Sequence, residues 1–167
     1  MVFALLSAIA YWKSSSYMPL LILATLLLLV SGFCDVLDGV LARSYQEVTV
    51  FGGFIDSLLD RYADAIVLGG IILGGFSNVS WGIATIIGTL LVSYARARAE
   101  AAGVKMESIG LAERPERIVI LALSSLVTLI WSPTLRLSII LLAILTNFTV
   151  LQRVIHFYRA LKKKPQI

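Results

Sequence analysis

Long charge-poor runs separated by short polar links form the dominant pattern of this chain. The runs cover residues 1–12, 17–33, 54–76, 81–92, 118–131 and 137–155. Each later run extends through its flanks to about 20 residues, the length that an α-helix needs to cross the hydrocarbon layer of a membrane. The first run is shorter, because its helix would reach only about 18 Å against roughly 30 Å of hydrocarbon. We therefore predict an all-α membrane protein, with six transmembrane helices in a single domain of residues 1–167 and the first helix truncated at its N-terminus.

The composition agrees with a protein surrounded by lipid. Hydrophobic residues make up 59% of the chain and charged residues 14%, whereas a soluble domain is roughly half apolar and one quarter charged. The single cysteine, Cys34, can form neither an internal disulfide nor a cysteine-cluster metal site.

The lysines and arginines give the predicted bundle an orientation. Twelve of the fourteen lie near the helix ends of one side, and only Lys13 and Arg136 mark the other. Because Lys and Arg in short loops stay on the cytoplasmic side, we expect a multi-pass cell-membrane protein with these ends in the cytoplasm. The net charge of +4 is then a consequence of topology, and we expect no nucleic-acid partner. The basic tail at 162–164 is expected to contact anionic membrane lipids.

Four aspartates stand beside membrane-depth sequence on the predicted cytoplasmic side. Asp35 and Asp38 close the second predicted helix, and Asp56 and Asp60 open the third. Spacings of three and four residues place each pair on one helical face, so two antiparallel helices can direct all four into one cavity. Such a cluster in a low dielectric needs protonation, arginine or a divalent cation. A divalent metal accounts best for the number of acids.

Other interpretations of these residues stay open. The aspartates could form ordinary interfacial pairs with Arg43 and Arg61. Asp64 continues the four-residue spacing one turn deeper, where it either packs between helices or supports the site from outside. Gly39 and Gly52 leave room beside the acids for a nucleotide or diphosphate, and close helix packing is the competing explanation.

Together these residues form one pattern, D-x-x-D-G-x-x-A-R, eight residues, then G-x-x-x-D-x-x-x-D. The specified positions are Asp35, Asp38, Gly39, Ala42, Arg43, Gly52, Asp56 and Asp60. The pattern resembles the signature of the CDP-alcohol phosphatidyltransferase family at all eight positions over 26 residues. The expected six helices extend the resemblance across nearly the whole chain.

The resemblance implies a phospholipid-synthesis enzyme. Such an enzyme transfers the diacylglycerol- or archaeol-phosphate group from a CDP-linked lipid to the hydroxyl of an alcohol and releases CMP. Asp35, Asp38, Asp56 and Asp60 are then ligands of Mg²⁺ or Mn²⁺, and Asp60 is also the catalytic base that deprotonates the hydroxyl. The nucleotide and diphosphate would contact Asp38, Gly39, Ala42, Arg43 and Gly52.

A second basic set lies on the same side of the membrane and includes Arg96, Arg98, Arg114, Arg117 and Arg153. The rigid fork of arginine suits phosphate, although positive-inside bias alone also places arginines here. The segments 93–100 and 110–117 resemble the inositol-phosphate-using branch of the family. We therefore expect a phosphorylated acceptor, with inositol 1-phosphate first and glycerol 3-phosphate or another alcohol as the alternative.

Two other classes of function are considered. An ion-coupled transporter also uses intramembrane acids, but its sites favour the bilayer midplane between inverted repeats, whereas these acids lie at one face. A non-catalytic scaffold would bind no divalent metal. The chain could also pair as a homodimer.

Overall fold

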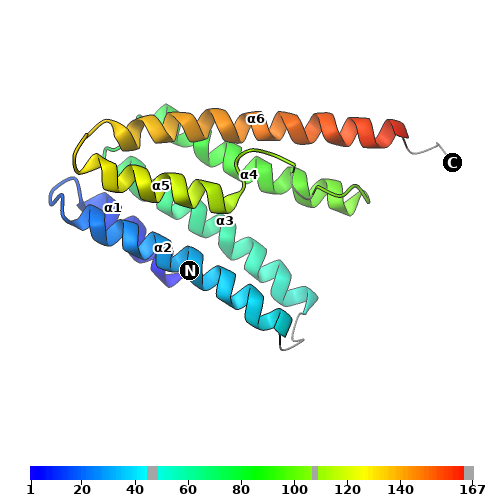
Figure 1. Cartoon of the computed structure of the whole chain (residues 1–167), viewed down its shortest axis with the longest axis horizontal. Coiled ribbons are helices and arrows are strands. Elements are labelled where there is room, and N and C mark those ends of the chain that lie inside the picture. Colours follow the sequence, from blue (N-terminus) through cyan, green and yellow to red (C-terminus); the bar gives the residue numbers. More distant parts are fainter. Residues whose placement is uncertain (45–48, 107–108, 164–167) are drawn as a thin grey trace.

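The computed structural model describes residues 1–44, 49–106 and 109–163, without the side chains at 39, 41–43 and 163. Its elements are α1 (Val2–Lys13), α2 (Leu20–Ser44), α3 (Val50–Leu73), α4 (Val79–Ala101), α5 (Arg114–Thr128) and α6 (Thr134–Lys163). The prediction of six helices in an all-α fold is confirmed (Figure 1). Most helices run beyond the apolar runs, and α6 continues eight residues past the predicted end at 155.

The helices differ in how well they suit a membrane. Among the described residues, three are long and apolar enough to cross one, namely α2, α4 and α6. Helix α3 has sufficient length but carries charged residues in its first half. Helices α1 and α5 have 12 and 15 residues and are shorter than the roughly 20 residues of a typical span.

The six helices close into a ring. Helix α1 packs against α2 and α3, α5 packs against α2 and α6, and α4 packs against α3 and α6. The order around the ring is therefore α1, α2, α5, α6, α4, α3. Helices α2, α3 and α5 carry the predicted acids and two of the five predicted acceptor arginines, and all three line one internal cavity.

Small residues allow the helices of the ring to approach closely. A Cβ added at Gly70 of α3 would collide with the backbone of Ala8 in α1, and one at Gly88 of α4 would collide with Thr146 of α6. The α4–α6 contact also contains a hydrogen bond from Thr85 Oγ1 to the Ile139 carbonyl, 3.0 Å long. Small side chains and interhelical hydrogen bonds are the usual means by which helices associate in lipid.

The up-and-down course of the chain places the charged helix ends together. The C-terminal ends of α2, α4 and α6 and the N-terminal end of α3 lie toward the right of the view in Figure 1, and the N-terminal end of α5 faces the same way but lies nearer the middle of the molecule. Local sequence fixes two of these starts. Thr49 caps α3 by accepting a hydrogen bond of 3.0 Å from the Gly52 amide, and Pro115 occupies the first turn of α5.

Candidate active site

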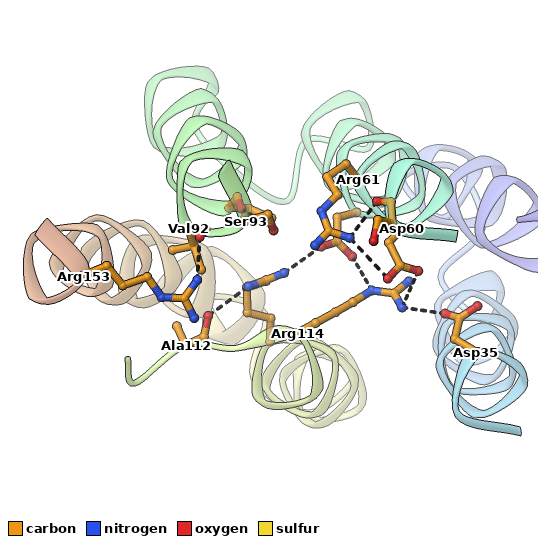
Figure 2. A network of polar contacts seen from close by, with 12 residues as sticks. Asp35, Asp60, Arg61, Val92, Ser93, Ala112, Arg114 and Arg153 are labelled. Atoms are coloured by element: carbon orange, nitrogen blue, oxygen red, sulfur yellow. Dashed lines mark hydrogen bonds and ion pairs between the residues drawn. The ribbon is translucent and has the colours of Figure 1, made fainter. Parts of the chain in front are cut away.

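Arg114 joins two of the predicted aspartates. Its Nη1 lies 2.8 Å from Asp35 Oδ2 of α2 and 2.7 Å from Asp60 Oδ1 of α3. Figure 2 shows the side chain reaching from the start of α5 to both helices. Since α5 packs against α2 within the ring, the first turn of α5 brings a cation between acids that are 25 positions apart in the sequence.

Asp64 holds the arginines of α5 from the other side. It accepts from Arg114 Nε at 3.3 Å and from Arg117 Nη2 at 2.7 Å. Arg117 is buried and also donates to the Ala112 carbonyl, 2.9 Å away. Of the two interpretations of Asp64, the outer partner of the site is therefore the one with direct contacts.

The carboxylates stabilise the charge of Arg114. Burial by itself would lower the pKa of Arg114, but the negative charges of Asp64, Asp60 and Asp35 outweigh it and raise the pKa above its ordinary value. Arginine stays protonated in proteins in any case, so the aspartates stabilise a cation that is always present. A partly buried group of acids needs such compensation because it has lost part of its contact with water.

Two carboxylate oxygens beside Arg114 have the chemistry of divalent-cation ligands. Asp35 Oδ2 and Asp60 Oδ1 meet at one nitrogen, so they can be no farther apart than the sum of the two distances, about 5.5 Å. Asp35 Oδ2 is buried and, among the described residues, has no hydrogen-bond partner of suitable geometry despite its ion pair with Arg114. Buried carboxylate oxygens with free lone pairs are ligands that Mg²⁺ and Mn²⁺ prefer.

The other predicted ligands do not share this arrangement. Asp38 and Asp56 are exposed, and within residues 1–44, 49–106 and 109–163 no group of three or more His, Cys, Asp or Glu side chains is close enough to hold a metal ion. The four-aspartate metal site therefore stays a prediction.

The predicted nucleotide contacts are only partly described. Gly39, Ala42 and Arg43 lie outside the described side chains. Gly52 is exposed, and a Cβ there would come within 2.8 Å of the capping Thr49 Oγ1. The N-terminal cap of α3 therefore gives Gly52 a structural role besides the predicted room for the nucleotide.

Four of the five predicted acceptor arginines line one cavity of about 200 Å³. Its wall contains Asp60, Arg61, Val92, Ser93, Arg96, Glu113, Arg114, Pro115, Arg117 and Arg153. Five arginines face two carboxylates in this wall, so the cavity has an excess of three positive charges. Asp60 thus belongs both to the aspartate site and to the arginine-rich cavity, and a phosphorylated molecule bound here would lie beside a carboxylate.

Arg153 connects α6 to this cavity from a buried position. Its Nε donates to the Ile109 carbonyl at 2.8 Å, its Nη1 to the Val92 carbonyl, and its Nη2 to Glu113 Oε1 at 3.3 Å. Figure 2 shows it on the opposite side of the network from Asp35. These bonds use three of the five guanidinium N–H groups, leaving two for a ligand.

Arg98 does not line the arginine-rich cavity. It lines an apolar cavity of about 280 Å³ between α4 and α6, whose wall also contains Tyr94, Met106, Phe157 and, of the predicted arginines, Arg153. Conversely, Arg61 and Ser93 line the arginine-rich cavity although they were absent from the predicted acceptor set. Arg61 follows Asp60 directly in sequence, which was the signal available for it.

Comparison with known proteins agrees with this arrangement. Residues 1–153 match the family model of CDP-alcohol phosphatidyltransferases. This chain belongs to the CDP-alcohol phosphatidyltransferase family. The predicted enzyme class is therefore confirmed, and the transporter and scaffold alternatives are set aside.

Relatives of this phosphatidyltransferase include an archaetidylinositol phosphate synthase of Methanothermobacter thermautotrophicus, 46% identical over 143 residues that cover 85% of this chain and 73% of the relative. A crystal structure of Mycobacterium tuberculosis phosphatidylinositol phosphate synthase with manganese and citrate matches with a TM-score of 0.78 and 26% identity, covering 94% of this chain and 79% of the other. The same enzyme with CDP-DAG bound matches with a TM-score of 0.74 and 27% identity, covering 94% and 85%. The phosphatidyltransferase thus has the fold of a membrane enzyme.

Proposed function

We propose that this phosphatidyltransferase joins a CDP-linked lipid to inositol 1-phosphate and releases CMP. The observation that carries the proposal is the shared wall in which Asp60 stands beside four of the predicted acceptor arginines. A phosphate held by these arginines places the rest of the acceptor near a carboxylate. The names of the relatives, archaetidylinositol and phosphatidylinositol phosphate synthases, support inositol phosphate over glycerol 3-phosphate.

In the proposed reaction, Asp60 takes the proton of the acceptor hydroxyl. The hydroxyl oxygen forms a bond to the lipid-proximal phosphorus of the CDP-lipid, and the bond from that phosphorus to the oxygen bridging to CMP breaks. CMP departs with the electron pair. Phosphoryl substitution of this kind depends mainly on positioning and charge stabilisation, which the arginine-rich wall can supply on the acceptor side.

Asp35, Asp38, Asp56 and Asp60 are the proposed ligands of Mg²⁺ or Mn²⁺. The buried, unbonded oxygen of Asp35 and its convergence with Asp60 support the first and last of these. When bound, the metal would neutralise negative charge on the diphosphate of the donor. The side chains of Asp38 and Asp56 are exposed, and among the described residues neither forms an ion pair.

The two substrates are proposed to meet at the charged helix ends of the ring. The lipid donor enters from the bilayer, and the phosphorylated acceptor enters from the cytoplasm, the side on which the lysines and arginines concentrate. A site at the cytoplasmic ends of membrane-spanning helices is open to both routes. A homodimer stays a prediction.

The test is the release of CMP from a CDP-linked lipid in the presence of Mg²⁺ and one acceptor at a time. Inositol 1-phosphate, glycerol 3-phosphate, free inositol and serine form the panel. We expect the highest kcat/KM with inositol 1-phosphate. A preference for glycerol 3-phosphate would retain the phosphate cavity and replace the acceptor, whereas a preference for free inositol or serine would refute the role of the arginines.

A further inference from the structure

We propose that Arg114 is the resident counter-cation of the aspartate site formed by Asp35 and Asp60, and that a divalent cation displaces it toward the arginine-rich cavity. Metal binding would then make the Arg114 guanidinium available to a phosphate in that cavity. This inference rests on the metal site of the proposed function. It goes further because it assigns to Arg114 the coupling between the divalent cation and the acceptor phosphate.

The position of Arg114 between two sites is the first support. Its Nη1 contacts Asp35 and Asp60, at 2.8 and 2.7 Å. The same side chain forms part of the wall of the arginine-rich cavity. A short rotation of the guanidinium therefore exchanges carboxylate partners for whatever occupies the cavity.

The geometry of the Asp35 contact is the second support. Asp35 Oδ2 lies 2.8 Å from Arg114 Nη1, yet among the described residues it receives no hydrogen bond of suitable geometry. The contact between Asp35 Oδ2 and Arg114 is therefore an electrostatic attraction without a directional hydrogen bond. Such a contact is easily replaced by another cation, because a metal ion makes no angular demand on a donor hydrogen.

Asp64 determines which part of Arg114 can move. It holds Nε at 3.3 Å, close to the base of the guanidinium, and it is itself tied to Arg117 at 2.7 Å. A divalent cation on Asp35 and Asp60 would repel the nearby Nη1 while Asp64 retains the Nε end. The terminal nitrogens then turn away from the aspartates.

Arg61 does not have this role. Its Nη1 is 3.4 Å from Asp60 Oδ2, a longer contact, and the same nitrogen donates to the Ser57 carbonyl of its own helix at 2.7 Å. Arg61 has no contact with Asp35 among the described residues. Only Arg114, within the described part of the chain, neutralises both acids.

The experiment measures Mn²⁺ affinity directly, from the electron paramagnetic resonance signal of free Mn²⁺ at pH 8 in detergent, without turnover. Arg114→Gln removes the competing cation, so we expect Mn²⁺ to bind more tightly by on the order of tenfold, within the usual range of coupling between sites. Arg114→Lys keeps the charge and should return the affinity close to wild type. Arg136→Gln is the matched control, because Arg136 lines a different cavity, beside Ser14 and Met18, and it should leave Mn²⁺ affinity unchanged.

A second measurement follows the acceptor side. Inositol 1-phosphate binding is measured by calorimetry with and without Mg²⁺, in the absence of the lipid donor. We expect Mg²⁺ to strengthen binding in wild type and in Arg136→Gln, and to do so much less in Arg114→Gln, since coupling is reciprocal. If wild type binds Mn²⁺ and Arg114→Gln has the same affinity, the inference is wrong and the proposed function stands. If wild type binds no Mn²⁺, the proposed metal site is refuted and the inference with it.

Discussion

Replacing Asp60 with Asn separates the chemistry of this carboxylate from its structural contacts. Asp60 Oδ1 is 2.7 Å from Arg114 Nη1, and the amide of Asn retains an oxygen that can accept there. Arg114 also keeps Asp35 and Asp64 as partners. We therefore expect a small loss of stability, about 1 kcal/mol, from the weaker hydrogen bond.

The kinetic effect should be much larger. Asn cannot take the proton of the acceptor hydroxyl, and loss of a general base lowers kcat by roughly 10²- to 10⁴-fold, equivalent to about 3–5 kcal/mol in the barrier. The assay is CMP release at saturating CDP-linked lipid and inositol 1-phosphate, beside Mn²⁺ affinity and the melting temperature in detergent. If Asp60 is the base, the increase in the activation free energy must exceed the decrease in the free energy of unfolding.

Asp64→Asn is the matched control for this prediction. Asp64 lies one turn farther along α3, contacts Arg114 and Arg117, and does not line the arginine-rich cavity. Asp64→Asn should lower the free energy of unfolding more than Asp60→Asn does, and it should lower kcat less. A kcat for Asp60→Asn within tenfold of wild type, with Mn²⁺ still bound, would refute the base role.

Three further predictions concern the remaining parts of the structure. Arg153→Lys keeps the charge but cannot reach three acceptors at once, so the KM for inositol 1-phosphate should rise by roughly 10-fold or more, measured from initial rates of CMP release. Asp56→Asn should weaken Mn²⁺ binding by about tenfold or more if Asp56 is a ligand, and unchanged affinity would remove it from the metal site. Gly88→Val should lower stability by at least about 2 kcal/mol because Thr146 occupies the space of the new side chain, which a lower melting temperature in detergent would show and an unchanged one would contradict.

The sequence predicted the elements that depend on local pattern. Six apolar runs gave six helices, because in lipid each helix must satisfy its own backbone hydrogen bonds. The spacing of the family signature gave the family, which residues 1–153 confirm. It also placed Asp35 and Asp60 at helix ends of the same side, where the structure brings them to one cation.

The partners of the charged residues depended on the tertiary structure. Nothing in the chain states that α5 lies between α2 and α6, so the pairing of Arg114 with Asp35, 79 positions away, and the separation of Arg98 from the cavity could not be predicted. Asp64 had two equal interpretations until the ring placed Arg114 and Arg117 against it. The sequence alone determined which helices form and what chemistry their ends carry, because these follow from local hydrophobicity and spacing. The packing order of the helices decided which charges meet, because an ion pair depends on distance in space.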